Sequence, residues 1–206
     1  MTTKTEEQEK EPEPIKTMWV IIAALLIPVI ILGVYWYTSQ VTVEEYTHNG
    51  FVFTQIPCEV GECWQTTVIS NVGEHPVLFF HGPRELEDIT IDPAAVDRVL
   101  NLTRIANTSL RIGFDEGVPG EVAIAASNIA RVTGDRFYRI PTRGGVYGVD
   151  FTCSSATLTR PVLYLTQDEQ TGVYLQDNCI YAVAPTTAEL VRVSDAYTLH
   201  LLQIMR

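Results

Sequence analysis

The chain has 206 residues, of which 46% are hydrophobic, and its formal net charge at pH 7 is −11. This length suits one membrane segment and one folded domain, since a domain usually contains about 100 to 200 residues. After Lys16 the only strong cations are 11 scattered arginines against 20 acidic residues. This balance disfavours nucleic-acid binding, because phosphate contacts need clustered positive charge.

The first 37 residues predict a disordered tail followed by a transmembrane helix. Residues 1–17 are charged, contain prolines and have no large apolar side chain before Ile15, so they cannot bury enough surface to fold alone. Residues 18–37 contain no charged side chain. At about 1.5 Å rise per residue, this run matches a hydrocarbon core about 30 Å thick. Trp19 and Trp36 lie near its two ends, where aromatic rings favour the headgroup layer.

We interpret residues 18–37 as a retained signal anchor. A cleaved signal peptide would have an apolar region of about 7 to 15 residues and end at a small-residue cleavage site. Three lysines precede the span, whereas no Lys or Arg follows it until Arg84. By the positive-inside rule the N-terminus is cytoplasmic. Residues 38–49 are then a juxtamembrane linker and first strand, and residues 50–206 form an extracytoplasmic domain at the cell membrane.

Short β-prone runs open the predicted domain. The dipeptide Asn49-Gly50 is a tight-turn signal between β-prone flanks. Residues 64–71 and 77–82 are rich in β-branched and aromatic side chains, and turn residues separate them. We expect a small antiparallel unit here.

Helical signals follow this unit. Asp92 and Pro93 are typical of an N-cap and a first helical position, so they predict a short helix over residues 93–102. Residues 109–115 have the pattern of a buried strand. The next helix is predicted over residues 119–134 from an apolar stripe at helical spacing, formed by Val122, Ala125, Ala126 and Ile129.

The last part of the chain alternates predicted strands and a final helix. Strands are predicted at residues 137–140, 146–153, 161–166 and 172–184. A helix capped near Thr186 or Thr187 ends the chain, with one apolar face formed by Leu190, Val193, Tyr197, Leu201 and Ile204. The sequence therefore predicts a single N-terminal transmembrane helix plus a mixed α/β (α+β) globular domain with helices packed on a sheet.

Four cysteines, all in the predicted outside portion, indicate disulfides. Thiols tend to be oxidised there, and the simplest pairing joins Cys58 to Cys63 and Cys153 to Cys179. Four cysteines allow three connectivities, so the other two stay open. A four-cysteine zinc site or a redox-active pair usually shows C-x₂-C spacing, whereas the spacing here is C-x₄-C. We therefore expect no metal and no cofactor.

A search for catalytic and metal-binding patterns finds little. The sequence lacks the nucleophile elbow, the zinc-protease motif, the P-loop and the dinucleotide fingerprint. His75 and His81 would lie about 20 Å apart along one continuous strand, too far to share a metal. His48 and His200 are expected at solvated or core-edge positions. The acidic run at residues 84–92 is more typical of a solvated edge than of a calcium site.

Two asparagines are candidate glycosylation sites. Asn101 and Asn107 both match the N-x-[ST] acceptor pattern, and both fall in the predicted helix-to-strand connection. Chance matches to this pattern are common, and modification requires an organism that glycosylates asparagine.

The chain resembles a group of uncharacterised single-span archaeal membrane proteins. The residues that carry the resemblance are the segment Asp177-Asn178-Cys179-Ile180 and the final helix, which contains T-A-E-L-V-R-V-S-D and Asp195. The resemblance implies one anchor and one outside α/β domain, and it implies no activity. These residues are packing and disulfide positions, so they indicate kinship and no site.

Two functional hypotheses follow. The first is a membrane-anchored, non-catalytic extracytoplasmic domain that binds a protein partner or forms part of a cell-envelope or membrane complex. The alternative is a hydrolase-like cell-envelope enzyme that uses Asp115, Glu116, Asp150 or a histidine. The alternative requires these groups to meet in a concave pocket. A sensing role, with signals passing through Pro28 to the tail, is weakened by the absence of a folded output module in the tail.

Overall fold

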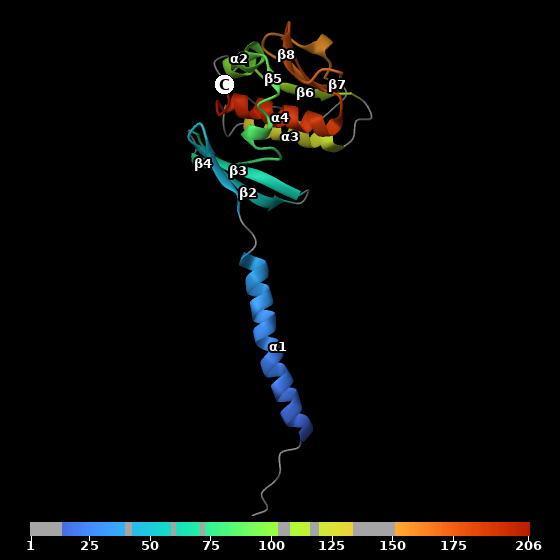
Figure 1. Ribbon diagram of the computed structural model, residues 1–206. Coiled ribbons are helices and arrows are strands. Elements are labelled where there is room, and N and C mark those ends of the chain that lie inside the picture. Colours follow the sequence, from blue (N-terminus) through green and yellow to red (C-terminus); the bar gives the residue numbers. More distant parts are fainter. Residues whose placement is uncertain are drawn as a thin grey trace, which may run out of the picture. The chain divides into compact units, whose positions relative to one another are not determined.

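The computed structural model describes residues 14–39, 43–58, 61–70, 73–102, 108–115, 120–133 and 151–206. The chain divides into two compact units, residues 1–43 and 44–206 (Figure 1). The described part of the first unit is a helix, and the second unit contains the folded domain.

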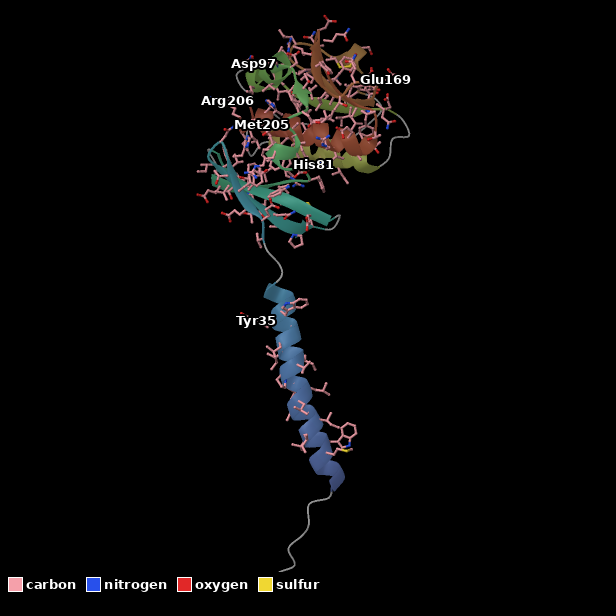
Figure 2. All side chains as sticks on the ribbon, viewed as in Figure 1. Tyr35, His81, Asp97, Glu169, Met205 and Arg206 are labelled. Atoms are coloured by element: carbon pink, nitrogen blue, oxygen red, sulfur yellow. A yellow bond between two sulfur atoms is a disulfide. The ribbon has the colours of Figure 1, made fainter. Side chains whose placement is uncertain are left out.

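Helix α1 (Pro14–Ser39) is the one helix in the described part of the chain that is long and apolar enough to cross a membrane. None of its candidate span, Met18–Trp36, is buried against the rest of the chain, and its side chains project outward (Figure 2). An apolar helix of this kind fits a membrane anchor or a signal sequence. Residues 14–17 of the predicted tail are helical, whereas residues 1–13 lie outside the described residues.

Sheet A, at the start of the second unit, is a four-stranded antiparallel meander. It consists of β1 (Glu45–His48), β2 (Phe51–Cys58), β3 (Gly61–Ser70) and β4 (Gly73–Phe79), paired in chain order. Asn49 and Gly50 both have positive φ, 49° and 86°, as the two-residue turn between β1 and β2 requires. The predicted antiparallel unit is confirmed.

Sheet B has five strands in the order β5-β8-β9-β7-β6. Its strands are β5 (Thr90–Ile91), β6 (Arg111–Phe114), β7 (Val162–Gln167), β8 (Gly172–Gln176) and β9 (Cys179–Ala184). The pairs β5–β8, β6–β7 and β7–β9 are parallel, whereas β8–β9 is antiparallel. The mixed sheet agrees with the predicted α+β class.

The helices begin where local signals predict. Helix α2 (Pro93–Leu102) is capped by Asp92, whose Oδ1 accepts the N–H of Ala94 at 2.9 Å. Helix α4 (Thr187–Leu201) is capped by Thr186, whose hydroxyl oxygen accepts the N–H of Glu189. Both caps pair backbone donors that have no partner within the helix. Helix α3 (Gly120–Thr133) buries its predicted apolar stripe.

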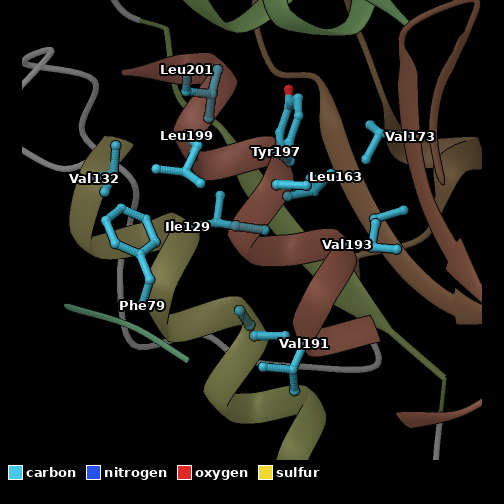
Figure 3. Close-up of a cluster of buried hydrophobic side chains, with 14 of the residues drawn as sticks. Phe79, Ile129, Val132, Leu163, Val173, Val191, Val193, Tyr197, Leu199 and Leu201 are labelled. Carbon is cyan, nitrogen blue, oxygen red and sulfur yellow. The ribbon is translucent and has the colours of Figure 1, made fainter. Parts of the chain in front are cut away.

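Helices α3 and α4 lie between the two sheets (Figure 1). Ten of the 15 residues of α4 are buried, since the helix contacts α3 and α2 as well as strands of sheet B. One hydrophobic core joins Phe79 of sheet A to Leu163 of sheet B through α4 (Figure 3). The sequence predicts helices on a sheet. The structure adds that α4 has apolar neighbours on more than one side, because a second sheet covers this layer.

The strand predicted over residues 146–153 is wrong in its described part. Residues 151 and 152 pair with no described strand, and Cys153–Ser155 form a short 3₁₀ turn, η2. The hydroxyl of Ser155 donates to the carbonyl of Thr152, and such local side-chain bonds compete with a strand ladder. Residues 146–150 and the predicted strand at residues 137–140 lie outside the described residues.

The outer strand β6 contains a glycine that no larger residue can replace without movement. A Cβ at Gly113 would overlap the backbone carbonyl oxygen of Phe151. Because backbone moves less easily than a side chain, Gly113→Ala is expected to lower the free energy of unfolding by about 1 to 3 kcal/mol. In Gly120→Ala, the control, a Cβ meets nothing within 4 Å and alanine favours helix α3. Denaturation followed by the fluorescence of buried Trp64 measures both, and equal effects would contradict this packing.

Candidate binding cleft

A cleft of about 410 Å³ opens between one end of sheet A and helix α3. Sheet A lines it with two cysteines and with Leu78 and Phe79, and Phe80, which follows β4, lines it as well. The described lining residues from α3 are Ala123, Ile124, Ser127, Asn128 and Arg131. The cleft is therefore mostly apolar, and Arg131 is the one charged side chain among its described lining residues.

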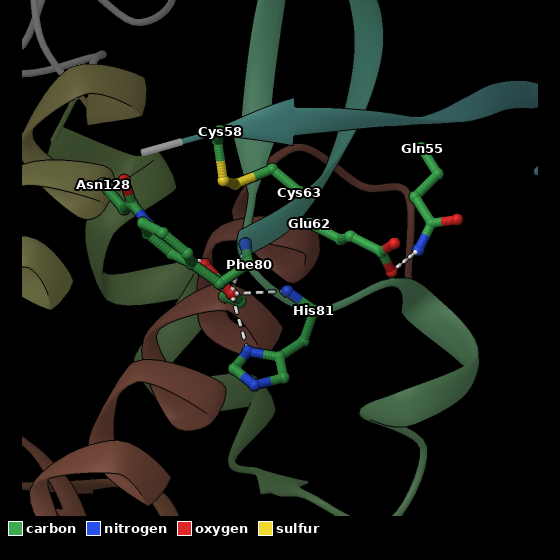
Figure 4. Close-up of a disulfide and its surroundings, with 8 residues drawn as sticks. Gln55, Cys58, Glu62, Cys63, Phe80, His81 and Asn128 are labelled. Atoms are coloured by element: carbon green, nitrogen blue, oxygen red, sulfur yellow. Dashed lines mark hydrogen bonds and ion pairs between the residues drawn. A yellow bond between two sulfur atoms is a disulfide. The ribbon is translucent and has the colours of Figure 1, made fainter. Parts of the chain in front are cut away.

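One wall of the cleft is the disulfide between Cys58 and Cys63 (Figure 4). The bond crosses the β2–β3 hairpin next to its turn, where Cys58 pairs with Gly61, and the two Cα atoms are 5.9 Å apart. Gly61 has φ of 129°, a conformation that favours glycine. The bond holds the two strand ends together at the mouth of the cleft.

The second disulfide joins Cys153 of η2 to Cys179 at the start of β9, with the two Cα atoms 5.3 Å apart. Both bonds join the pairs that the sequence favours. No cysteine is free, so no thiolate is left for the alternative of a four-cysteine zinc site.

The fully buried carboxylate of Asp195 in α4 bonds to two residues that line the cleft. Its Oδ2 accepts the backbone N–H groups of Phe80 and His81 at 3.0 Å and lies 3.1 Å from Nδ1 of His81. Its Oδ1 accepts Nδ2 of Asn128 at 3.1 Å. Phe80 and Asn128 both line the cleft. The carboxylate therefore fixes the sheet wall and the helix wall of the cleft relative to each other.

Burial controls the electrostatics of this carboxylate. Loss of water raises the pKa of Asp195, although the bonds from His81 and Asn128 act in the opposite direction. The His81 ring is 26% exposed, and its bond to Asp195 fixes its orientation. A His–Asp pair is one part of a hydrolytic site, which needs a nucleophile as well. The described partners of Asp195 are Phe80, His81 and Asn128, none of which is an activated nucleophile, so we interpret the pair as a brace.

The acidic residues of the hydrolase hypothesis do not form a common site in the described residues. Asp115 follows β6, and its carboxylate oxygens accept the hydroxyls of Tyr164 at 2.6 Å and Thr166 at 2.5 Å. The bond to Asp115 raises the pKa of Tyr164 to about 12, and burial adds to this effect. Asp115 therefore joins β6 to β7 and does not line the cleft. Glu116 and Asp150 lie outside the described residues.

The other histidines lie apart from the cleft. His75 is in β4 and His81 follows the end of that strand, so they do not share one continuous strand as the sequence predicts. His48 and His200 both line a wider concavity of about 980 Å³, formed by the β1–β2 turn, α2 and the end of the chain. Partial burial lowers the pKa of His200. The described rim of this concavity carries charges of both signs, on Glu87, Asp97 and Arg206.

Three acidic residues of the run at residues 84–92 make structural contacts within the domain. Glu85 accepts the indole N–H of Trp64 at 2.9 Å, and Asp88 forms an ion pair with Arg192 at 2.8 Å. Asp92 caps α2. Of the described residues, no group of three or more His, Cys, Asp and Glu side chains is placed to hold a metal ion.

The candidate glycosylation sites differ in what the structure says of them. Asn101 is exposed near the end of α2, whereas Asn107 lies outside the described residues. The exposed amide of Asn101 is accessible to a modifying enzyme, and its modification stays a prediction.

The residues that build and brace the cleft were not identified as a site from the sequence. Phe80 and Asn128 belong to elements predicted for packing, and Arg131 is one of 11 scattered arginines. The usable signal was Asp195, because a carboxylate between Ser194 and Ala196 in a helix of mainly apolar residues needs a buried partner.

Comparisons with known proteins add nothing to the cleft. The chain matches no protein-family model, no curated protein and no solved structure. The function therefore has to be argued from the residues themselves.

Proposed function

We propose that this chain is a membrane-anchored, non-catalytic extracytoplasmic domain that binds a protein partner in the cleft between sheet A and α3. The observation that carries the proposal is the bracing of the cleft: one wall is crossed by a disulfide and two walls bond to the same buried carboxylate. A preformed site loses less conformational entropy on binding than a mobile one. A mainly apolar cleft with few polar groups is typical of binding sites.

The proposed location rests on three properties of the chain. Helix α1 contains one apolar span, and the three lysines of the chain precede it. The two disulfides favour an oxidising compartment for the folded domain. A retained anchor with the N-terminus in the cytoplasm places the domain outside, in line with the positive-inside rule.

The hydrolase alternative has less support. Its one described carboxylate, Asp115, has both oxygens occupied by hydroxyls of neighbouring β7. The His81–Asp195 pair resembles the His–Asp part of a catalytic triad. However, the Asp195 carboxylate also accepts two backbone N–H groups and the Asn128 amide. A structural role, in which Asp195 joins α4 to the segment after β4 and to α3, accounts for all of these bonds.

Site-specific photocrosslinking in native membranes tests the proposal. A photoreactive amino acid replaces Leu78, which lines the cleft, or Ala94, an exposed residue of α2 that does not. We expect a reproducible protein crosslink from position 78 and none from position 94. Ala123→Trp, which fills the cleft from its exposed α3 side, is expected to remove the crosslink. A crosslink that persists in Ala123→Trp, or that forms equally from both positions, contradicts binding in the cleft.

A further inference from the structure

We propose that the occupant of the cleft is an extended segment of a partner protein that presents a carboxylate beside an apolar side chain, with Arg131 binding the carboxylate. This inference rests on the proposed function, since it names the chemistry of the partner that the cleft binds. Three properties of the cleft carry it: the single cation among its described lining residues, its apolar walls and the edge position of strand β4.

Arg131 is the cation of the cleft. It is exposed in the last turn of α3, where a positive charge complements the helix dipole. Its side chain forms no hydrogen bond or ion pair with any residue that the structure describes. Its guanidinium therefore offers several N–H donors in a planar arrangement that matches a carboxylate. The helix dipole explains a positive charge at this position but leaves these donors available to a ligand.

The negative net charge of the chain makes Arg131 a specific site for an anion. The chain carries −11, so most of its surface repels an acidic partner, and a lone guanidinium beside an apolar cleft fixes where an anion can approach. One cation suits one carboxylate. A polyphosphate would need several clustered cations, which the described lining residues do not provide.

The walls next to Arg131 accept an apolar group. Leu78, Phe80, Ile124 and the Cys58–Cys63 bond line the cleft, and its volume of about 410 Å³ lies within the range of small-ligand sites. The bonds from Phe80 and Asn128 to Asp195 keep these walls in place before any ligand binds. Burial of one apolar side chain here supplies affinity, and Arg131 supplies orientation.

The sheet edge favours a peptide over an anionic lipid. Strand β4 is one of the two edge strands of sheet A, and among the described strands it pairs only with β3. Backbone groups on the outer side of an edge strand can bond to an extended peptide, whereas an acyl chain has no groups to pair with them. Pro76 interrupts this edge and Phe79 is buried, so the partly exposed Leu78 at the cleft is the part of the edge that remains for a ligand.

Matched peptides test the inference on the full chain in nanodiscs. The probes are two capped, fluorescein-labelled hexapeptides that differ only in a Glu-Phe or a Gln-Phe pair, with myristate as a lipid probe. We expect the Glu-Phe peptide to bind about five- to tenfold more tightly than the Gln-Phe peptide, because a charge-assisted bidentate bond is stronger than a neutral one. Arg131→Gln is expected to remove this difference. Arg160→Gln, a change at an exposed arginine away from the cleft, is expected to preserve it, and Ala123→Trp to weaken both peptides.

The remaining outcomes separate this inference from the proposed function. If both peptides bind equally and both are lost in Ala123→Trp, the cleft binds peptides and the role of Arg131 is overturned. If myristate alone binds and depends on Arg131, the ligand is an anionic amphiphile and the peptide is overturned. If no probe binds while the crosslink from position 78 persists, only this inference fails. If the crosslink is missing as well, the proposed function fails with it.

Discussion

Replacing Asp195 by alanine is expected to lower the free energy of unfolding by about 3 to 5 kcal/mol. Four donors lose their acceptor in this variant: the N–H groups of Phe80 and His81, the His81 ring and the Asn128 amide. Each donor left unpaired in the interior costs about 1 to 3 kcal/mol, partly offset where water enters. The lost bonds join the segment after β4 and helix α3 to helix α4. Because these bonds hold the walls of the cleft, we also expect the variant to bind its ligand less tightly.

Denaturation of the full chain in detergent micelles measures this effect through Trp64, which is buried in sheet A. The matched control is Asp97→Ala, which removes an exposed carboxylate of α2 and is expected to change stability by about 0.5 kcal/mol or less. A loss in Asp195→Ala no larger than that of the control contradicts the bracing role of the buried carboxylate.

The same carboxylate predicts a pH dependence with a definite sign. Burial raises the pKa of Asp195 above its ordinary value of 3.8, so the folded state binds this proton more tightly than the unfolded state. The stability contributed by this group is fully present below the unfolded pKa and is lost as the pH rises through the folded pKa. Asp195→Asn removes this dependence. The free energy of unfolding of the natural chain, relative to Asp195→Asn, is therefore expected to fall as the pH rises above the ordinary value of 3.8. A rise over this range contradicts the assigned direction.

Local signals predicted the fold well because caps and turns depend on neighbouring residues. Asp92 and Thr186 mark the starts of α2 and α4, and Asn49-Gly50 forms the first hairpin turn. These local signals could not predict the order of the layers, because that order depends on which strands pair across long distances in the sequence. Val191 and Leu199 lie outside the predicted apolar face of α4 and are also buried. Apolar residues on a second side of the helix were therefore the sequence signal for a second layer.

The cleft was harder to predict than the fold. Its described walls come from Cys58 and Cys63, from residues 78–80 and from helix α3, which no local sequence pattern connects. The disulfide pairing could be predicted, since a separation of only five positions between Cys58 and Cys63 favours a bond across one hairpin. The role of Asp195 was not, because a buried carboxylate is explained only once its donors, Phe80, His81 and Asn128, are known to surround it.

Removal of the Cys153–Cys179 disulfide is the second change with a large expected effect. A bond with a sequence separation of 26 stabilises by about 3.5 kcal/mol in the chain-entropy description, because it restricts the unfolded chain. The Cys58–Cys63 bond, with a separation of 5, contributes about 2 kcal/mol on the same basis. The two double Cys→Ala variants are therefore expected to differ in unfolding free energy by about 1 to 2 kcal/mol.

The binding assays are expected to rank these two variants in the opposite order, because only Cys58 and Cys63 line the cleft. Loss of the Cys153–Cys179 bond acts on η2 and β9, so it should leave peptide affinity unchanged at temperatures where the domain stays folded. Loss of the Cys58–Cys63 bond lets one wall of the cleft move, so it should weaken peptide binding. Its effect on the free energy of unfolding is nevertheless expected to be the smaller of the two. Binding that follows global stability in both variants would show that the disulfide wall does not shape the cleft.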